Sequence, residues 1–125
     1  MFINLSNHPS SKWSEEQTEA ARPFGDIVDL PFPQVDPNGD ETYIARLANE
    51  YCQKVIDMAG GKPVAVHLMG EMTLTFALAR LLKAAGIACM AATTERVVVE
   101  NEPGVKTAIF RFVRFRNQDA GNHRW

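Results

Sequence analysis

The sequence has 125 residues, of which 46% are hydrophobic and 22% are charged, and its formal net charge is -2. This length predicts one domain with a sizeable apolar core. The weakly acidic balance excludes a protein that coats nucleic acid nonspecifically, because such proteins carry a basic field. No apolar stretch approaches the roughly 18 residues of a membrane span, and the first residues lack the pattern of a secretory signal. We therefore expect a cytoplasmic protein that has no membrane partner.

The first third of the chain predicts two short strands that flank a helix. Residues 1–6 form an apolar run and are the first expected strand. Ser14 and Gln17 match a capping box, which predicts a helix over residues 15–21. A second apolar run, residues 26–30, follows this helix and is the second expected strand. A proline-rich loop comes after it.

The middle of the chain predicts the unit around which the fold is organised. Asp40 is placed to cap a long helix over residues 41–59, in which apolar residues recur at helical spacing. The run PVAVHLM, residues 63–69, is almost entirely apolar and predicts a strand that is buried on both faces. A glycine turn and a second amphipathic helix over residues 72–85 follow it. A strand, a tight turn and a helix in this order are typical of a βαβ unit.

The last part of the chain predicts strands only. Residues 87–92 are an apolar strand, and residues 97–99 continue as strand. Residues 101–104 form a turn, and residues 106–116 return as the last strand, so that a hairpin protrudes. Residues 117–125 are expected to be a flexible C-terminal tail, which leaves residues 1–116 as the domain.

The order of these elements predicts an α/β fold, namely a single Rossmann-like domain with a mainly parallel sheet. Strands that alternate with helices give a parallel sheet with helices on both faces. The simplest layout has strand order 2-1-3-4 with an antiparallel edge strand, and it ends in a C-terminal β-hairpin. The chain then reverses its winding direction between strands 1 and 3. Ligands of open α/β sheets bind at such a reversal, outside the carboxyl ends of the strands.

The residues that follow strands 1, 3 and 4 are therefore the candidate site. Many of them are small hydrogen-bond donors, and a glycine stands where a ligand would approach the backbone. Because a helix begins at about Met72, we expect its free N–H groups to face the crevice and to favour an anion, most simply a phosphate. The candidates are Asn7, His8, Ser10, Ser11, Lys12, Gly70, Glu71, Met72, Thr73, Thr93, Thr94, Glu95 and Arg96.

Several of these residues also have an ordinary structural interpretation. Glu71 at a helix start either compensates the helix dipole, or it binds a ribose hydroxyl or accepts its proton. Thr94 and Arg96 are either plain strand residues or ligand contacts. The alternation of arginine and phenylalanine in residues 110–116 suits nucleotide stacking, although one core face and one solvated face explain it better. Phe76 lies off the apolar stripe of its helix, which indicates a subunit contact.

The sequence contains no recognisable metal or cofactor motif. No His, Cys, Asp and Glu cluster has metal-ligand spacing, and neither a P-loop nor the dinucleotide-binding GxGxxG is present. The two cysteines, Cys52 and Cys89, are not in a CxxC pair and are expected to be buried thiols. Any catalysis is therefore expected to need no cofactor and no metal.

Three segments together resemble small proteins encoded beside type III CRISPR systems. These are HLMGEMTLTFALARLLKAAG, ATTERVVVE and FRFVRFR. The order of elements is also similar to the CRISPR-associated Rossmann fold, or CARF, over residues 1–116. The resemblance implies a homodimer whose two crevices join across a twofold axis. It implies a cyclic oligoadenylate, a ring of linked adenosine phosphates, as the ligand.

Some proteins of this kind cleave the ring and are called ring nucleases, whereas others only hold it as a sponge. The implied cleavage is metal-independent: the ribose 2'-hydroxyl attacks the adjacent phosphorus and leaves a 2',3'-cyclic phosphate. The resemblance makes His8, Glu71 and Arg96 the candidate catalytic residues. His8 or Glu71 would take the proton, and Arg96 would hold phosphate together with Ser10, Ser11 and Lys12. Other readings remain open: a Rossmann-like domain for a mononucleotide or sugar phosphate unrelated to CRISPR, and a purely structural domain whose hairpin is a partner surface.

Overall fold

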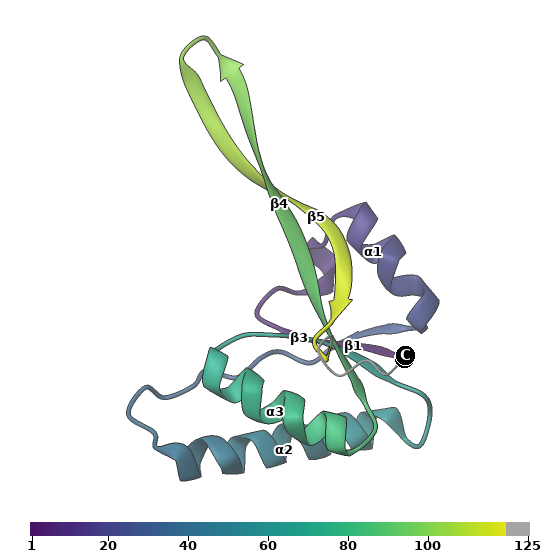
Figure 1. The fold of residues 1–125 in the computed structure, drawn as a ribbon. Coiled ribbons are helices and arrows are strands. Elements are labelled where there is room, and N and C mark those ends of the chain that lie inside the picture. The colour runs from purple at the N-terminus through teal and green to yellow at the C-terminus, as the bar shows by residue number, and fades with distance from the viewer. Residues whose placement is uncertain (120–125) are drawn as a thin grey trace.

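A computed structural model describes residues 1–119 and contains a five-stranded sheet in the order β2-β1-β3-β4-β5 (Figure 1). Strands β1 to β4 pair in parallel, and β5 pairs with β4 in antiparallel orientation. The predicted fold class, strand order and antiparallel edge strand are confirmed. The strands are β1 (Phe2–Ser6), β2 (Ile27–Asp29), β3 (Ala65–Met69), β4 (Ala88–Glu102) and β5 (Val105–Asn117).

Three α-helices cover the two faces of this sheet, with α1 on one face and α2 and α3 packed together on the other (Figure 1). Helix α1 begins where the Ser14 hydroxyl accepts the Gln17 amide at 3.2 Å, as the capping box predicts. None of the helices described is long and apolar enough to cross a membrane. The helices are α1 (Glu15–Ala21), α2 (Glu41–Ala59) and α3 (Met72–Ala84), with 3-10 turns η1 (Ser10–Lys12) and η2 (Arg22–Phe24).

Each face of the sheet has its own apolar cluster. On the side of α2 and α3, aliphatic side chains of β1 and β3 pack against buried leucines of α3 such as Leu74, Leu78 and Leu82. On the side of α1, the cluster is aromatic and contains Phe2 and Trp13, with Phe115 of β5 packed against it. The buried strands β1 and β3 thus contribute to both clusters, which explains their continuous apolar sequence.

The strands β4 and β5 leave the sheet together and form a long hairpin that projects from the domain (Figure 1). The sequence predicts a strand over 87–92 that continues as strand over 97–99, and the structure has one strand of 15 residues, Ala88–Glu102. Threonine and valine side chains favour extended backbone, and pairing with β5 continues through the whole segment. The ladder shifts register between Thr93 and Thr94, where β5 has one extra residue.

The first three residues of the predicted tail, 117–119, are held against the domain. Gln118 donates its backbone N–H to Cys89 O at 2.9 Å and its side-chain amide to Leu68 O at 2.7 Å. Asp119 pairs with Lys83 at 2.8 Å. The rest of that tail, residues 120–125, lies outside the described residues.

Candidate functional site

The loops after β1 and β3 meet at one cavity. Ser6 and Met69 are partners in the parallel ladder, so the two loops leave the sheet side by side. A cavity of about 360 Å³ lies there, with Asn7 and Glu71 in its wall. Residues 32–35, which follow β2, line the rest of it. The two loops are predicted at this position from the sequence, whereas the third wall is not. The apolar Phe32 inside a proline-rich loop is the signal that could have indicated it.

Glu71 caps helix α3 with its own side chain. Its carboxylate accepts the Thr73 hydroxyl and the Thr73 amide, both at 2.7 Å, and the Leu74 amide at 3.1 Å. The bond from the Thr73 hydroxyl, followed by those from the two backbone amides, lowers the pKa of this carboxyl below its usual value. Two of the amides that we expected to be free for a phosphate, those of Thr73 and Leu74, are therefore already occupied by Glu71.

Asn4 lies at the centre of a buried polar network beneath the loop after β1. Its side-chain N–H₂ donates to His8 O at 2.8 Å and to Asp29 Oδ1 at 2.9 Å. Its Oδ1 accepts the Ser6 hydroxyl at 2.8 Å and lies 2.9 Å from Nδ1 of His67. This one amide, only 1% exposed, joins β1, β2, β3 and the loop. Buried polar groups with all partners present fix one arrangement, so the network sets the path of the loop.

His67 is a core histidine with one partnered nitrogen. Both hydrogens of the Asn4 amide are in use, so Oδ1 faces His67 and Nδ1 of the ring carries the proton. Nε2 has no hydrogen-bond partner among residues 1–119. The Trp13 ring lies edge-on to the imidazole, with 5.6 Å between centroids. Burial, and then the nearby charge of His8, lowers the pKa of His67 from 6.5 to about 4.

We expect this histidine to make the protein less stable in acid. Between pH 6.5 and pH 4 the unfolded chain binds a proton at His67 that the folded chain does not, so stability falls as the pH falls through that window. The loss over that window amounts to roughly 3 kcal/mol, from 1.36 kcal/mol for each pKa unit. Urea unfolding of the wild type and of His67→Gln at pH 7.5, 6 and 4.5 measures it. The variant should lose less stability than the wild type on acidification, and parallel pH curves would contradict the assignment.

In the loop after β1, some of the predicted site residues have exposed side chains, and others form hydrogen bonds within the domain. The backbone of His8 is fixed, because its N–H donates to Ser6 Oγ and its C=O accepts from both Asn4 and Ser6, while its side chain is exposed. Ser10 is engaged through its N–H and its hydroxyl with the Asp29 carboxylate. The side chains that point to solvent belong to Asn7, His8, Ser11 and Lys12.

The loop after β3 is less open than we expect if Gly70 serves to let a ligand approach the backbone. A Cβ on Gly70 would lie 2.5 Å from the Phe32 ring, so the glycine is required by packing against this buried phenylalanine. Met72 is 80% exposed, and Thr73 is tied to Glu71. Gly70 therefore shapes the cavity indirectly, by allowing Phe32 to form its wall.

The predicted residues of β4 lie progressively further from this cavity. The last parallel pair joins His67 to Met90, so Arg96 stands four residues beyond the level of Met69, roughly 13 Å along the strand. Arg96 pairs with Phe110 on the projecting hairpin, and the structure does not bring it to the cavity. Thr93 and Thr94 are nearer the sheet, where the Thr93 hydroxyl donates to Arg114 O at 3.0 Å.

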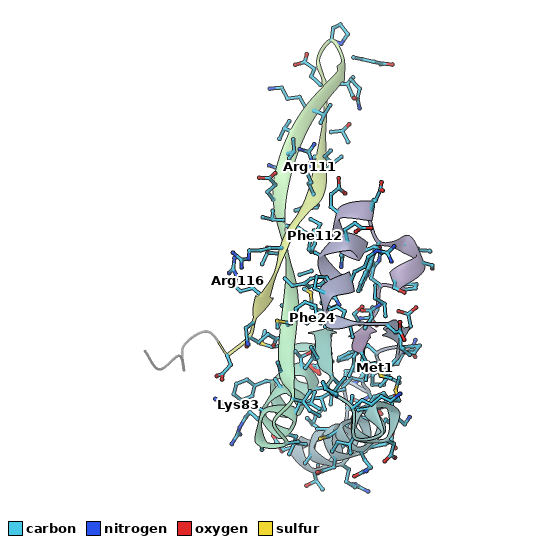
Figure 2. All side chains as sticks on the ribbon, turned by 90° about the vertical axis from the view of Figure 1, so that its right-hand side faces the viewer. Met1, Phe24, Lys83, Arg111, Phe112 and Arg116 are labelled. Atoms are coloured by element: carbon cyan, nitrogen blue, oxygen red, sulfur yellow. The ribbon has the colours of Figure 1, made fainter. Side chains whose placement is uncertain are left out.

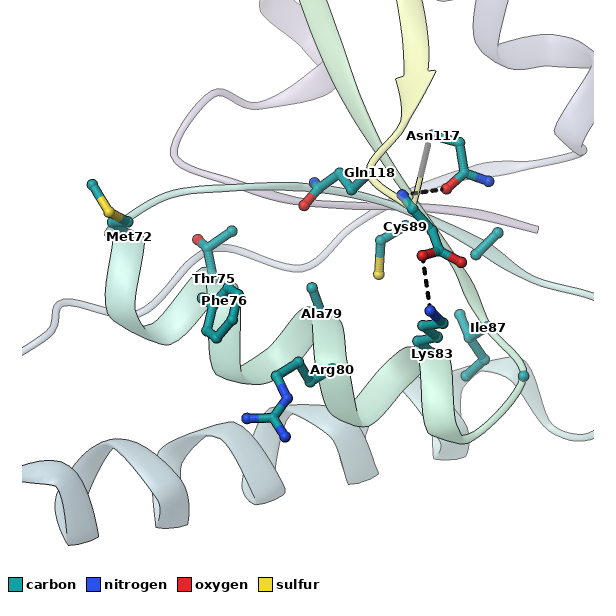
Figure 3. Close-up of a pocket in the computed structure, with 13 residues that line it drawn as sticks. Met72, Thr75, Phe76, Ala79, Arg80, Lys83, Ile87, Cys89, Asn117 and Gln118 are labelled. Atoms are coloured by element: carbon teal, nitrogen blue, oxygen red, sulfur yellow. Dashed lines mark hydrogen bonds and ion pairs between the residues drawn. The ribbon is translucent and has the colours of Figure 1, made fainter. Parts of the chain in front are cut away.

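A second and larger cavity, of about 590 Å³, lies between α3 and the first residues of β4 (Figure 3). Phe76 and Arg80 of α3 line it from one side, and the buried Cys89 and Gln118 from the other. The ion pair between Lys83 and Asp119 crosses one end of it. Burial, and secondarily the neighbouring Cys52, raises the pKa of the Cys89 thiol to about 11, so this sulfur stays protonated. The sequence marks Phe76 as an exposed aromatic residue, but it contains no local signal for this cavity.

Within residues 1–119, no three His, Cys, Asp or Glu side chains lie close enough together to bind a metal ion.

Among protein-family models, the one described as the uncharacterized protein MJ1673 family matches residues 1–116. A search of curated proteins finds no match.

Proposed function

We propose that this chain, which belongs to the uncharacterized protein MJ1673 family, binds a cyclic oligoadenylate in the cavity between the loops after β1 and β3. The observation that carries the proposal is the pair of Asn7 and Glu71 in the wall of one cavity, at the point where the sheet reverses its winding. This is where open α/β sheets bind their ligands.

The cavity wall matches a nucleoside better than a bare phosphate. Glu71 is held in its ionised form by Thr73 and Leu74, and such a carboxylate accepts hydrogen bonds from ribose hydroxyls but repels phosphate. The amide of Asn7 supplies both a donor and an acceptor for a base edge. Pro33 and Val35 offer apolar surface against which a base can pack.

The phosphate contacts come from the loop after β1. Lys12 ends the short η1 turn with its side chain exposed and with no ion pair in the part of the chain that the structure describes. Ser11 beside it exposes a hydroxyl. A cation and a hydroxyl on the loop after β1, together with the Glu71 carboxylate after β3, suit a ligand that alternates ribose and phosphate.

The resemblance of the three segments to CARF-like proteins supports the cyclic form of the proposed ligand. A cavity of about 360 Å³ accommodates roughly one nucleotide, whereas a ring of several adenosine phosphates needs more than one such cavity. We therefore infer a homodimer in which two cavities share one ring. Binding without cleavage, as in a sponge, requires only contacts to the ligand and no catalytic group.

Cleavage of the ring is a second candidate, and the placement of His8 favours it. Three hydrogen bonds fix the His8 backbone while its side chain remains exposed beside the cavity loop. Glu71 is the weaker base, because its lowered pKa reduces its affinity for a proton. In this step His8 takes the proton of the ribose 2'-hydroxyl, whose oxygen bonds to the adjacent phosphorus. The bond from phosphorus to the 5'-oxygen breaks, this oxygen takes a proton from water, and a 2',3'-cyclic phosphate remains.

Calorimetric titration with cyclic oligoadenylates of several ring sizes tests the binding. We expect one ring per dimer and an affinity that falls roughly tenfold in Lys12→Ala, since a charge-assisted contact is removed. Lys62→Ala is the matched control, as Lys62 is also exposed but lies at the opposite end of β3. AMP should compete only weakly. Absence of heat with every ring, or stronger binding of AMP than of any ring, would contradict the proposal.

Incubation of the protein with a labelled ring in the presence of EDTA then distinguishes cleavage from binding without cleavage. Linear products ending in a 2',3'-cyclic phosphate, lost in His8→Ala while binding persists, indicate a ring nuclease. A ring that is bound and recovered intact indicates a sponge.

A further inference from the structure

The hairpin of β4 and β5 carries an unusual amount of exposed apolar surface. Nine large hydrophobic side chains are exposed within residues 1–119, and five of them lie on these two strands. Phe110 is 71% exposed. The outer half of the hairpin projects beyond the helices (Figures 1 and 2). An isolated two-stranded ribbon is only marginally stable in water, so a partner that covers it would stabilise it. The five are Val98, Val105, Ile109, Phe110 and Val113.

The register of the hairpin divides its side chains between two faces. Cross-strand partners point to the same face, and successive residues alternate between faces. One face, here called the Phe110 face, contains three cross-strand pairs. The opposite face contains Val97 paired with Ile109, next to Glu95 paired with Arg111. The pairs of the Phe110 face are Arg96 with Phe110, Val98 with Ala108, and Glu100 with Lys106.

The charges of the hairpin argue against nucleic acid as the partner. Residues 94–114 hold three acidic side chains among four basic ones, so the ribbon has no strong basic field. The charges of the Phe110 face instead match a copy of that same face. When two ribbons stack about a twofold axis that runs along the hairpin, β4 of each lies over β5 of the other. Arg96 then meets the partner's Phe110, Val98 meets the partner's Ala108, and Glu100 meets the partner's Lys106.

We propose that the Phe110 face is an interaction surface for a second copy of this chain, with the two hairpins stacked about that axis. Each contact occurs twice: an arginine over an aromatic ring, a small apolar pair, and an ion pair. This contact involves the hairpin alone and does not depend on any ligand. It is therefore tested without one, and its failure leaves the ligand site untouched.

Charge reversal tests the stacking most sharply. In Glu100→Lys the contact would place lysine over lysine twice, and in Lys106→Glu it would place glutamate over glutamate twice. We expect each variant alone to dimerise roughly tenfold more weakly than the wild type. An equimolar mixture should form mixed dimers, because each contact then joins opposite charges. Native mass spectrometry and sedimentation equilibrium read this out. Failure of the mixture to recover dimerisation would overturn the proposal.

The apolar part of the contact is tested by Phe110→Ser with Ile109→Ser as its control. Both side chains are exposed neighbours on β5, but Ile109 belongs to the opposite face. Phe110→Ser should weaken dimerisation roughly a hundredfold, and Ile109→Ser should leave it within about threefold. Circular dichroism verifies that each variant folds, since neither residue lies in the core. A wild type that is monomeric at about 100 µM, equal effects of both variants, or loss of single-stranded RNA binding in place of dimerisation would each contradict the proposal.

Discussion

Replacing Asn4 by leucine is expected to lower the free energy of unfolding by about 4 kcal/mol. The new side chain fills a similar volume but provides no polar atoms. Nδ1–H of His67 would lose its acceptor, and the Ser6 hydroxyl would keep only the His8 carbonyl, at 3.1 Å. The Asp29 carboxylate and the His8 carbonyl would each lose one of their donors. Each buried polar group without a partner costs about 1–3 kcal/mol, less for those that water can reach. Urea unfolding followed by tryptophan fluorescence measures the change.

The control for this substitution is Asn49→Leu. Asn49 is exposed on α2 and makes one hydrogen bond, from its side-chain amide to Ala45 O. Its replacement should change stability by no more than about 0.5 kcal/mol. Asn4→Leu should also loosen the loop that carries His8, and faster amide exchange in residues 7–12 would show this. A loss of less than about 1 kcal/mol in Asn4→Leu would mean that the network does not hold the loop.

Replacing Phe2 by alanine is expected to cost about 4 kcal/mol as well, by a different mechanism. Phe2 is fully buried, and its ring stacks on Phe24 with 4.9 Å between centroids. It also meets the edges of Phe115, at 5.1 Å, and Trp13, at 6.4 Å. Removing a phenyl ring from such a cluster loses its burial and leaves a cavity, which costs about 3–5 kcal/mol in other cores.

Phe76→Ala is the control for the removal of a phenyl ring. Phe76 is an exposed residue of α3, so its loss should change the stability of the monomer by no more than about 0.5 kcal/mol. Thermal unfolding of the two variants at low micromolar concentration gives the comparison. Similar losses in the two variants would show that the aromatic cluster on the α1 face contributes little to folding.

The parallel sheet and its strand order could be predicted because local sequence patterns indicate each strand and helix. Continuous apolar runs such as residues 65–69 alternate with helices whose caps, Ser14 and Asp40, are visible in the sequence. Right-handed crossovers then leave few topologies. The loops after β1 and β3 follow directly from that order, and the structure places Asn7 and Glu71 in one cavity as a result.

What could not be predicted depends on side-chain direction. Glu71 is a plausible ligand contact in the sequence, but only the structure shows its carboxylate turned back onto Thr73 and Leu74. Asn4 looks like one polar residue inside an apolar strand, and nothing local reveals that it joins three strands. Arg96 comes shortly after the apolar run that predicts strand 4, which suggests a position at the cavity. In the structure β4 continues past the cavity into the hairpin, because β5 pairs with β4 as far as Glu102.

The central claim, that the two loops bind one cyclic oligoadenylate, is tested most directly by amide hydrogen exchange with and without the ring. Segments 7–12 and 70–73 should become protected together, to the same extent and at the same ring concentration, because a single ligand bridges them. Protection of α3 around Phe76 and of Gln118, which line the larger cavity, with no change at the two loops, would contradict the claim.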